Sequence, residues 1–147
     1  MGEKAFVTNE RSAERIHAFG DEIVVLASSA STGNRFCLFQ QVYPTMVWSP
    51  LHRHDNEAHF VYVIDGDMEF EVSSVSFECR AGEGLYMPSG QWHRFRALTE
   101  LPVRMLIFNF PGGFDNMYTE IANSPTGSEG DPQRQDILKR YGVQTKD

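Results

Sequence analysis

The chain has 147 residues and a hydrophobic content of 41%, a usual size and composition for one domain built around one core. The formal net charge of −7 and the lack of a basic cluster argue against nucleic-acid binding, which needs a basic face to meet phosphates. No apolar run is long enough for a membrane span, and the first twenty residues lack the apolar region of a secretory signal. We therefore expect a single cytoplasmic domain over residues 1–147, without nucleic-acid or membrane partners.

Short β-strands are predicted one after another between residues 21 and 110. The clearest pattern is at residues 68–72, where Met68, Phe70 and Val72 alternate with two glutamates, as in a half-buried strand. A Gly-Asp pair at residues 66–67 is predicted to form a two-residue turn before it. Glycines and prolines separate the candidates. The predicted strands are residues 21–28, 34–43, 59–65, 68–72, 76–80, 84–88, 93–98 and 103–110.

The last part of the chain predicts two short helices. One covers residues 112–123, and the other covers residues 131–142, with Asp131 as N-cap, Pro132 at the first helical position and Gly142 as the stop. Many short strands without helices between them indicate an all-β sandwich or barrel. We expect a barrel core at about residues 21–110 and a helical extension at about 111–147, packed outside the barrel or over one mouth.

Four of the five histidines fall in two short segments, which suggests a metal site. His52 and His54 are two residues apart, so on an extended chain both rings point to the same face. His59 begins the next predicted strand, and His93 lies near a later Gly/Pro turn. Exposed turn histidines would explain neither the pair nor the clustering, whereas imidazole nitrogens suit Fe, Mn, Ni, Cu or Zn. We therefore expect one divalent transition-metal ion per chain; His17 stands alone and is expected to be a packing or surface residue.

The first histidine segment resembles the first motif of the cupin superfamily. That motif has His-x-His, three or four residues, a glutamate, six residues and a glycine. Here it reads His52, Arg53, His54, four residues, His59, six residues and Gly66.

The second histidine segment resembles the second cupin motif, which has a glycine, five residues, Pro-x-Gly, two residues and a histidine. Here these are Gly82, Pro88, Gly90 and His93, and Ala97 stands where an asparagine usually ends the motif. The segments at 31–42 and 111–123 also resemble small single-domain cupins of the quercetin dioxygenase-like type. The resemblance implies a double-stranded β-helix, or jelly-roll barrel, with short C-terminal helices and a metal held inside.

Within this resemblance, the ligands are His52, His54 and His93, and the usual fourth ligand is a glutamate. Counting back from Gly66 puts His59 at that position, which gives a four-histidine variant of the site. Glu57 is the alternative, because it shares strand parity with His59 and a one-residue bulge could bring either side chain to the metal. Four neutral imidazoles leave the full double charge on the ion, which favours anionic substrates such as enolates and phenolates. Glu57 could then serve as a catalytic base without binding the metal.

The resemblance predicts a metal-dependent enzyme, and a dioxygenase acting on a small aromatic or enolic molecule is the first hypothesis. A non-redox cyclase, isomerase or lyase of polyketide-like intermediates is the alternative, with the metal as a Lewis acid only. A ligand-binding cupin without turnover is a third. Trp48 and Phe95 are the candidate substrate contacts, with Tyr43, Tyr62 and Phe108 as further aromatic candidates.

Two further expectations concern cysteines and partners. Cys37 and Cys79 have no motif spacing and are expected to be free thiols on strands, although spacing alone leaves a disulfide open. The aromatic strand at 34–43 suggests a homodimer.

Overall fold

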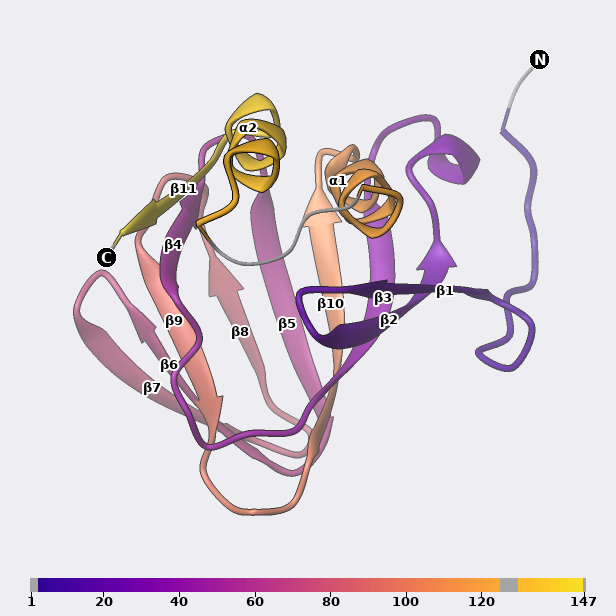
Figure 1. Ribbon diagram of the computed structural model, residues 1–147. Coiled ribbons are helices and arrows are strands. Elements are labelled where there is room, and N and C mark those ends of the chain that lie inside the picture. Colours follow the sequence, from indigo (N-terminus) through magenta and orange to yellow (C-terminus); the bar gives the residue numbers. More distant parts are fainter. Residues whose placement is uncertain (1–2, 125–129, 147) are drawn as a thin grey trace.

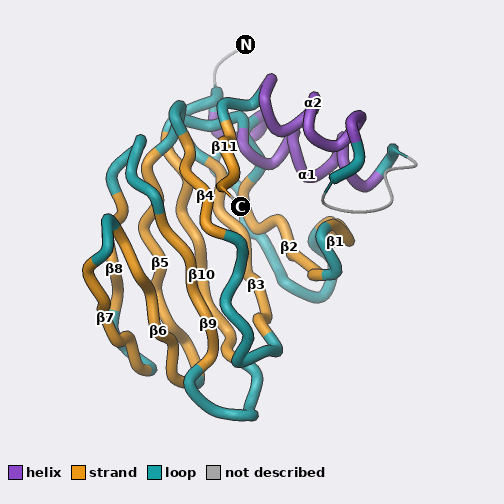
Figure 2. Tube along the Cα trace, turned by 60° about the vertical axis from the view of Figure 1, so that its left-hand side comes forward, coloured by secondary structure: helices purple, strands orange, loops and turns teal. Residues whose placement is uncertain are grey.

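The computed structural model describes residues 3–124 and 130–146 and contains two antiparallel sheets that face each other, with two helices at one end (Figure 1, Figure 2). In order of neighbours, the six-stranded sheet consists of β1 (Glu14–Ala18), β2 (Asp21–Ala27), β3 (Cys37–Tyr43), β10 (Val103–Phe110), β5 (Ala58–Asp65) and β8 (Gly84–Met87). The five-stranded sheet consists of β11 (Val143–Lys146), β4 (Leu51–His54), β9 (His93–Ala97), β6 (Asp67–Val72) and β7 (Val75–Arg80). This arrangement confirms the predicted all-β jelly-roll fold.

The prediction of a hairpin turn at residues 66–67 is wrong. β5 and β6 are consecutive in the chain but lie in different sheets, so Gly66 is a corner between sheets and no hairpin closes there. Both strands bury alternate apolar residues, and each can do so only on the inner face of its own sheet. Gly66 has φ +99°, and a Cβ atom there would lie 2.9 Å from Cγ2 of Val103. The corner therefore requires glycine.

Three strands were not predicted: β1, β4 and β11. Each is four or five residues long and buries one or two side chains at most, so its apolar pattern is weak. β11 pairs with β4 along its whole length, with Thr145 opposite His52 and Val143 opposite His54. Tertiary pairing, rather than local sequence, therefore produces these strands.

Both predicted helices are present, as α1 (Phe114–Ala122) and α2 (Pro132–Arg140). The Asp131 side chain accepts hydrogen bonds from the backbone N–H groups of Gln133 and Arg134, so the N-cap prediction is confirmed. A short 3-10 turn, η1 (Ala30–Thr32), lies between β2 and β3. Among the described residues, neither helix has the length and apolarity needed to cross a bilayer. Part of the predicted loop between the helices, residues 125–129, lies outside the described residues.

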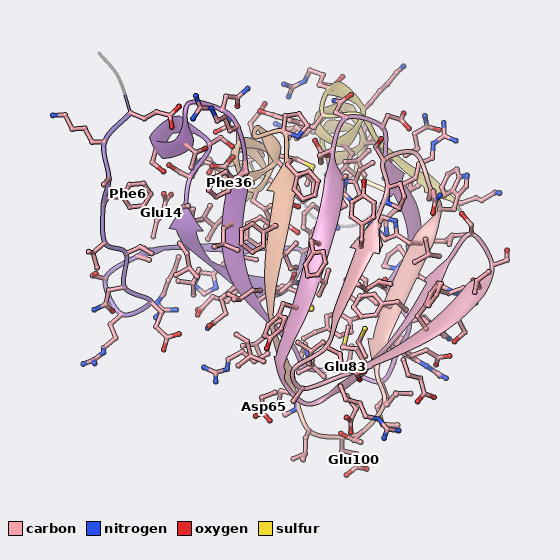
Figure 3. All side chains as sticks on the ribbon, turned by 180° about the vertical axis from the view of Figure 1, so that it is seen from behind. Phe6, Glu14, Phe36, Asp65, Glu83 and Glu100 are labelled. Atoms are coloured by element: carbon pink, nitrogen blue, oxygen red, sulfur yellow. The ribbon has the colours of Figure 1, made fainter. Side chains whose placement is uncertain are left out.

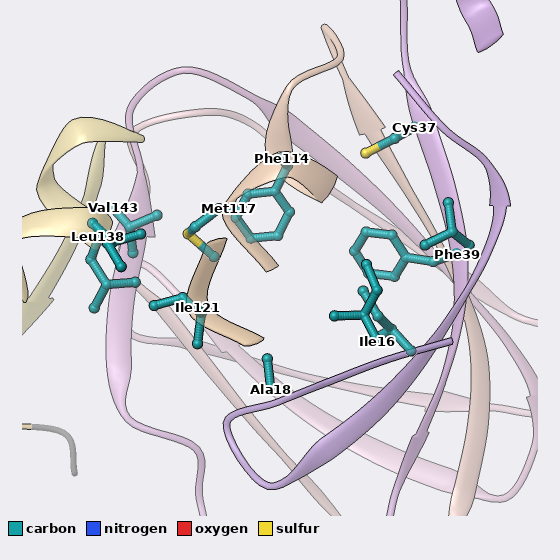
Figure 4. Packing of buried hydrophobic residues seen from close by; sticks show 12 residues of the cluster. Ile16, Ala18, Cys37, Phe39, Phe114, Met117, Ile121, Leu138 and Val143 are labelled. Atoms are coloured by element: carbon teal, nitrogen blue, oxygen red, sulfur yellow. The ribbon is translucent and has the colours of Figure 1, made fainter. Parts of the chain in front are cut away.

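The core has two parts that meet on the inner faces of the sheets. One part joins β1–β3 to the helices and includes Phe39, Phe114 and Met117, and Figure 4 shows these side chains converging between α1 and the sheet. The other lies between β5, β6, β8, β9 and β10 and includes Phe70, Met68 and Val63. Cys37 and Cys79 are buried, one in each part, and both are free thiols, as expected.

Candidate metal centre

Three strands bring the four clustered histidines together at the helix-covered end of the barrel. β4 carries His52 and His54, His59 is the second residue of β5, and His93 is the first residue of β9. The pairing of β4 with β9 sets His52 directly opposite His93, with ring centroids 4.3 Å apart. His54 and His59, which belong to different sheets, also have ring centroids 4.3 Å apart. His17 does not join them, since its side chain is 74% exposed and faces Glu22.

Potential ligand atoms fall into two overlapping groups. The ligand atoms of His52, His54 and His93 lie within 4.8 Å of one another, and so do those of His54, Glu57 and His59. His54 belongs to both groups, so the described part of the chain holds five candidate donors around one point. Such a set of nitrogens, with or without one carboxylate, suits a divalent transition metal.

In three of the four imidazoles, Nδ1 faces an oxygen atom within hydrogen-bond distance. Nδ1 of His52 lies 2.7 Å from the Pro50 carbonyl oxygen, and Nδ1 of His93 lies 3.0 Å from that of Gln91. Nδ1 of His59 lies 2.5 Å from Oδ1 of Asn109. These acceptors favour a proton on Nδ1 and leave the Nε2 lone pair free, which is the arrangement found around metal-binding histidines.

Nε2 of His59 is the most specific indication of an absent partner. It is buried and has no hydrogen-bond partner within the described structure, although buried nitrogens are normally satisfied. A metal ion would satisfy it. The residues therefore fit a metal on two grounds: the donor set and this unpartnered nitrogen.

The electrostatics of the cluster favour neutral imidazoles. Burial, together with the neighbouring His93, lowers the pKa of His52 to about 4 and that of His59 to about 3. Burial and the other three histidines lower the pKa of His54 well below its usual value, and burial alone lowers the pKa of His93. At neutral pH the four rings are thus uncharged, the state in which imidazole binds a metal.

Glu57 lies beside His54 and His59, and its ligand atoms are within 4.8 Å of theirs. Its Oε1 is 3.4 Å from Nδ1 of His54, and the side chain is buried. Burial, with the charge of Asp55, raises the pKa of this carboxyl to about 7. A carboxyl group that titrates near neutral pH beside an imidazole can hold or release a proton. The geometry therefore allows Glu57 either to face His54 as a partner or to bind a metal next to His59.

A cavity of about 930 Å³ is lined by the four histidines and reaches Gly20 and Asp21 at the β1–β2 turn and Thr145 and Lys146 of β11. Its walls are mainly apolar and aromatic and include Phe39, Phe95 and Phe114. Phe114 of α1 covers the inner end, with its ring centroid 4.7 Å from that of His54 and 5.6 Å from that of His59. This volume is sufficient for a small organic molecule with several rings.

The aromatic candidates divide between the cavity and the outer surface. Phe95 and Tyr43 line the cavity. Trp48 does not; its ring lies against the guanidinium groups of Arg94 and Arg96 at 4.5 and 4.6 Å, because these arginines project from the outer face of β9. Tyr62 and Phe108 are also absent from the cavity wall, since their strand parity turns them to the outer face of the six-stranded sheet.

Asn109 is a site residue that the sequence analysis missed. It is fully buried and holds His59 from the neighbouring strand β10, where the two residues are directly opposite. Its parity with Met105 and Ile107 places it on the inner face, and this was the available signal. The polar side chain in an otherwise apolar strand marks a position that needs a hydrogen bond.

Comparison with known proteins agrees with this fold. Residues 39–109 match the family described as "Cupin domain". Over 60 residues the chain is 35% identical to "Polyketide synthase CurC" of Streptomyces cyaneus, which covers 41% of this chain and 39% of that protein. Over 55 residues it is 34% identical to "Protein SchB" of Streptomyces halstedii, which covers 37% of this chain and 40% of that protein. The chain thus spans less than half the length of these curated relatives.

Solved structures share the fold at low identity. A cupin from Shewanella frigidimarina described as RmlC-like has a TM-score of 0.64 and 14% identity, covering 79% of this chain and 99% of that chain. Pac13 of Streptomyces, described as a nucleoside dehydratase, has a TM-score of 0.62 and 12% identity, covering 77% of this chain and 88% of that chain.

Proposed function

We propose, on the premise that this chain is a member of the cupin superfamily, that it is a metal-dependent enzyme acting on a small aromatic or enolic molecule. The observation that carries the proposal is the cluster of four neutral histidines at the inner end of a large aromatic cavity. His52, His54, His59 and His93 would hold one ion of Fe, Mn, Ni, Cu or Zn. The bound ion would supply Lewis acidity toward an enolate or phenolate oxygen and, with a redox-active metal, reactivity with O₂.

The protein's own residues contribute orientation, charge and exclusion of water. The carbonyl oxygens of Pro50 and Gln91 and the amide of Asn109 hold three imidazoles in fixed orientations. Because all four imidazoles are neutral, they leave the positive charge of the site for an anionic oxygen of the substrate. Phe114 and the aromatic walls keep water from the inner end of the cavity, which strengthens electrostatic interactions there.

Glu57 is proposed as the proton-handling group. With a pKa of about 7, its carboxyl can hold or release a proton at Oε1, beside Nδ1 of His54. Because Glu57 does not line the cavity, it would exchange this proton with the His54 ring and not with the substrate directly. In this role Glu57 does not bind the ion.

Dioxygenase chemistry is the first candidate reaction. An oxygen electrode should record O₂ uptake when the metal-loaded protein meets a flavonol, diketone or catechol, and uptake should vanish in His54→Ala. The matched control is His17→Ala, which removes a histidine far from the cluster. Absence of O₂ uptake across such a panel, with intact metal content, would contradict the dioxygenase.

A non-redox cyclase, isomerase or lyase is the second candidate. It is favoured by the relative named as a polyketide synthase and by the structural neighbour described as a nucleoside dehydratase. Conversion of an enolic substrate without O₂ consumption, detected by mass spectrometry under anaerobic conditions, would establish this reaction class. Binding without conversion would point to the third hypothesis, a ligand-binding cupin.

The homodimer is proposed to form through the outer face of the six-stranded sheet. Several large apolar side chains there are between 36% and 53% exposed: Val42, Phe60, Tyr62, Tyr86 and Phe110. Tyr86 and Phe110 stack with ring centroids 6.2 Å apart, and Figure 3 views this side of the molecule, with Phe36 labelled. Continuous exposed apolar surface is typical of an interface. Light scattering should report a dimer that Tyr86→Lys converts to a monomer; a monomeric wild type would contradict the proposed dimer.

A cytoplasmic location stays a prediction.

A further inference from the structure

The end of the cavity that lies away from the histidines has polar groups of its own. Gln41 of β3 projects from the inner face of the six-stranded sheet and is 4% exposed. Its sheet neighbours in register are Ile23 and Met105, which are both apolar and buried. A buried amide in an apolar wall costs free energy unless hydrogen bonds satisfy it. Its position is therefore unusual for a residue that serves only packing.

The partner of Gln41 is Asp21, which also faces the cavity. Nε2 of Gln41 donates to Oδ2 of Asp21 over 3.2 Å, a long hydrogen bond. Burial raises the pKa of the Asp21 carboxyl, although the bond from Gln41 opposes this. The charge of Asp21 contributes to the raised pKa values of Tyr43 and Tyr118, which also line the cavity.

A strained turn brings Asp21 to this place. The β1–β2 hairpin closes with Phe19 and Gly20 as its two loop residues, since Ala18 pairs directly with Asp21. Phe19 has φ +58°, a conformation that is rare for a bulky side chain and is found where surrounding structure maintains it. Its ring packs edge-on against Tyr118, with centroids 5.6 Å apart, and lines the cavity.

The distance between the two polar ends of the cavity is about the length of a molecule with three fused rings. Asn109, which holds His59, pairs in register with Cys37 on β3. Gln41 lies four residues further along β3, which at about 3.3 Å per residue is about 13 Å along the strand. The wall between these levels carries Phe39, Met105 and Ile107. A ligand that reaches both ends must therefore be long, flat and apolar in its middle.

We propose that Asp21 and Gln41, presented at the tip of the β1–β2 hairpin and on β3, form a second recognition site that binds a hydroxyl group at the far end of an elongated polycyclic phenol. The carboxylate of Asp21 accepts a hydrogen bond from the hydroxyl group, and the amide N–H of Gln41 donates a hydrogen bond to the hydroxyl oxygen. The other end of the same molecule presents its oxygen to the histidine cluster, so this inference rests on the proposed function for its second anchor. The site selects substrates by length and by a terminal hydroxyl.

The test compares two probes in binding titrations. Anthraflavic acid is a linear three-ring quinone with a hydroxyl at each end, and its mono-hydroxy analogue keeps one of them. A hydrogen bond to a charged group contributes about tenfold to a hundredfold in affinity, so the wild type should prefer anthraflavic acid by about that ratio. The preference should disappear in Gln41→Leu and fall strongly in Asp21→Asn.

The chain offers matched controls for both variants. Gln40→Leu changes the same residue type on the same strand but on the opposite face, opposite Leu106. Glu22→Gln changes the acidic residue next to Asp21; Glu22 forms an ion pair with Arg15 on the surface. Both should keep the wild-type preference.

Two further measurements separate recognition from structure and from the metal. Gln41→Leu should change the melting temperature little, because it removes a buried amide but also leaves the half-buried Asp21 carboxylate without its long hydrogen bond. If it fails to fold, Asp21→Asn decides. In metal-stripped protein the single hydroxyl of the analogue can occupy the Asp21–Gln41 site, so both probes should bind there with similar affinity and both should bind more weakly in Gln41→Leu. A chain without metal would therefore contradict the proposed function and leave this site measurable. A wild type that binds neither probe, shows no preference between them, or keeps its preference in both variants overturns the proposal.

Discussion

Replacing Asn109 with alanine should weaken metal binding without removing a ligand. Asn109 is fully buried, and its Oδ1 lies 2.5 Å from Nδ1 of His59. The substitution leaves a buried N–H group without an acceptor and lets the imidazole rotate away from the orientation that points Nε2 at the other rings. The effect should therefore appear in metal affinity more than in the fold.

The size of the effect follows from two independent rules. A buried donor left without a partner costs about 1–3 kcal/mol. Loss of the outer partner of a metal-binding histidine lowers metal affinity about 10-fold to 100-fold, which corresponds to about 1.4–2.8 kcal/mol. The two ranges agree, so we expect Asn109→Ala to retain metal about 10-fold to 100-fold less tightly than the wild type.

Competition with a graded series of chelators, followed by elemental mass spectrometry, measures this affinity. Asn109→Asp should restore tight binding, because a carboxylate also accepts from Nδ1–H and increases the basicity of the ring. Asn116→Ala is the control, since Asn116 is an exposed residue of α1. Wild-type affinity in Asn109→Ala, in a protein that loses metal on His59→Ala, would refute the reasoning, because His59 would then bind without its partner.

The remaining predictions concern the ligands and the fold. His54→Ala should abolish metal retention, because His54 belongs to both groups of candidate ligands, and elemental analysis of untagged protein checks this. His59→Ala should weaken metal retention clearly, whereas Glu57→Ala should leave metal content near normal. His59→Glu should keep the metal while shifting substrate preference away from anions. Loss of metal in Glu57→Ala with retention in His59→Ala would reverse the ligand assignment. Gly66→Ala and Gly82→Ala should each lower the free energy of unfolding in urea by about 1–2 kcal/mol, because both glycines have positive φ. Gly66→Ala should lower it more, because of the two only the Cβ at Gly66 would meet another side chain, Val103, at 2.9 Å. Equal losses would show that crowding at Val103 is relieved without penalty.

The strands that could be predicted are those whose own residues alternate over a sufficient length. In β6, Met68, Phe70 and Val72 are all buried, as their period-2 pattern indicated. β4 and β11 lack such a pattern, and they form by pairing: β11 with β4, and β4 also with β9. The corner at Gly66 was misjudged for a related reason: a Gly-Asp pair is compatible with a hairpin, and only packing shows that the two strands belong to different sheets.

The candidate site divides along similar lines. The spacing of His52 and His54 correctly placed both rings on one face, and His59 and His93 lie beside them. Gln41 and Asn109 share the parity of buried apolar residues on their strands, but a polar side chain at such a position was not taken as a sign of a site. Trp48 was named because it precedes the first motif, but its ring position depends on Arg94 and Arg96 across the sheet.

The pairing of β4 with β11 has a consequence for the order of events during synthesis. β4 carries two of the candidate ligands, yet it meets β9 at one residue pair and β11 at four. Residues near the start of β11 are 89 positions further along the chain, as the bond between Gln144 and Asp55 shows. Contacts of such separation form late, because a long loop must close first. β4 is thus synthesised well before its main pairing partner, and metal uptake would report the completion of the β4–β11 pairing.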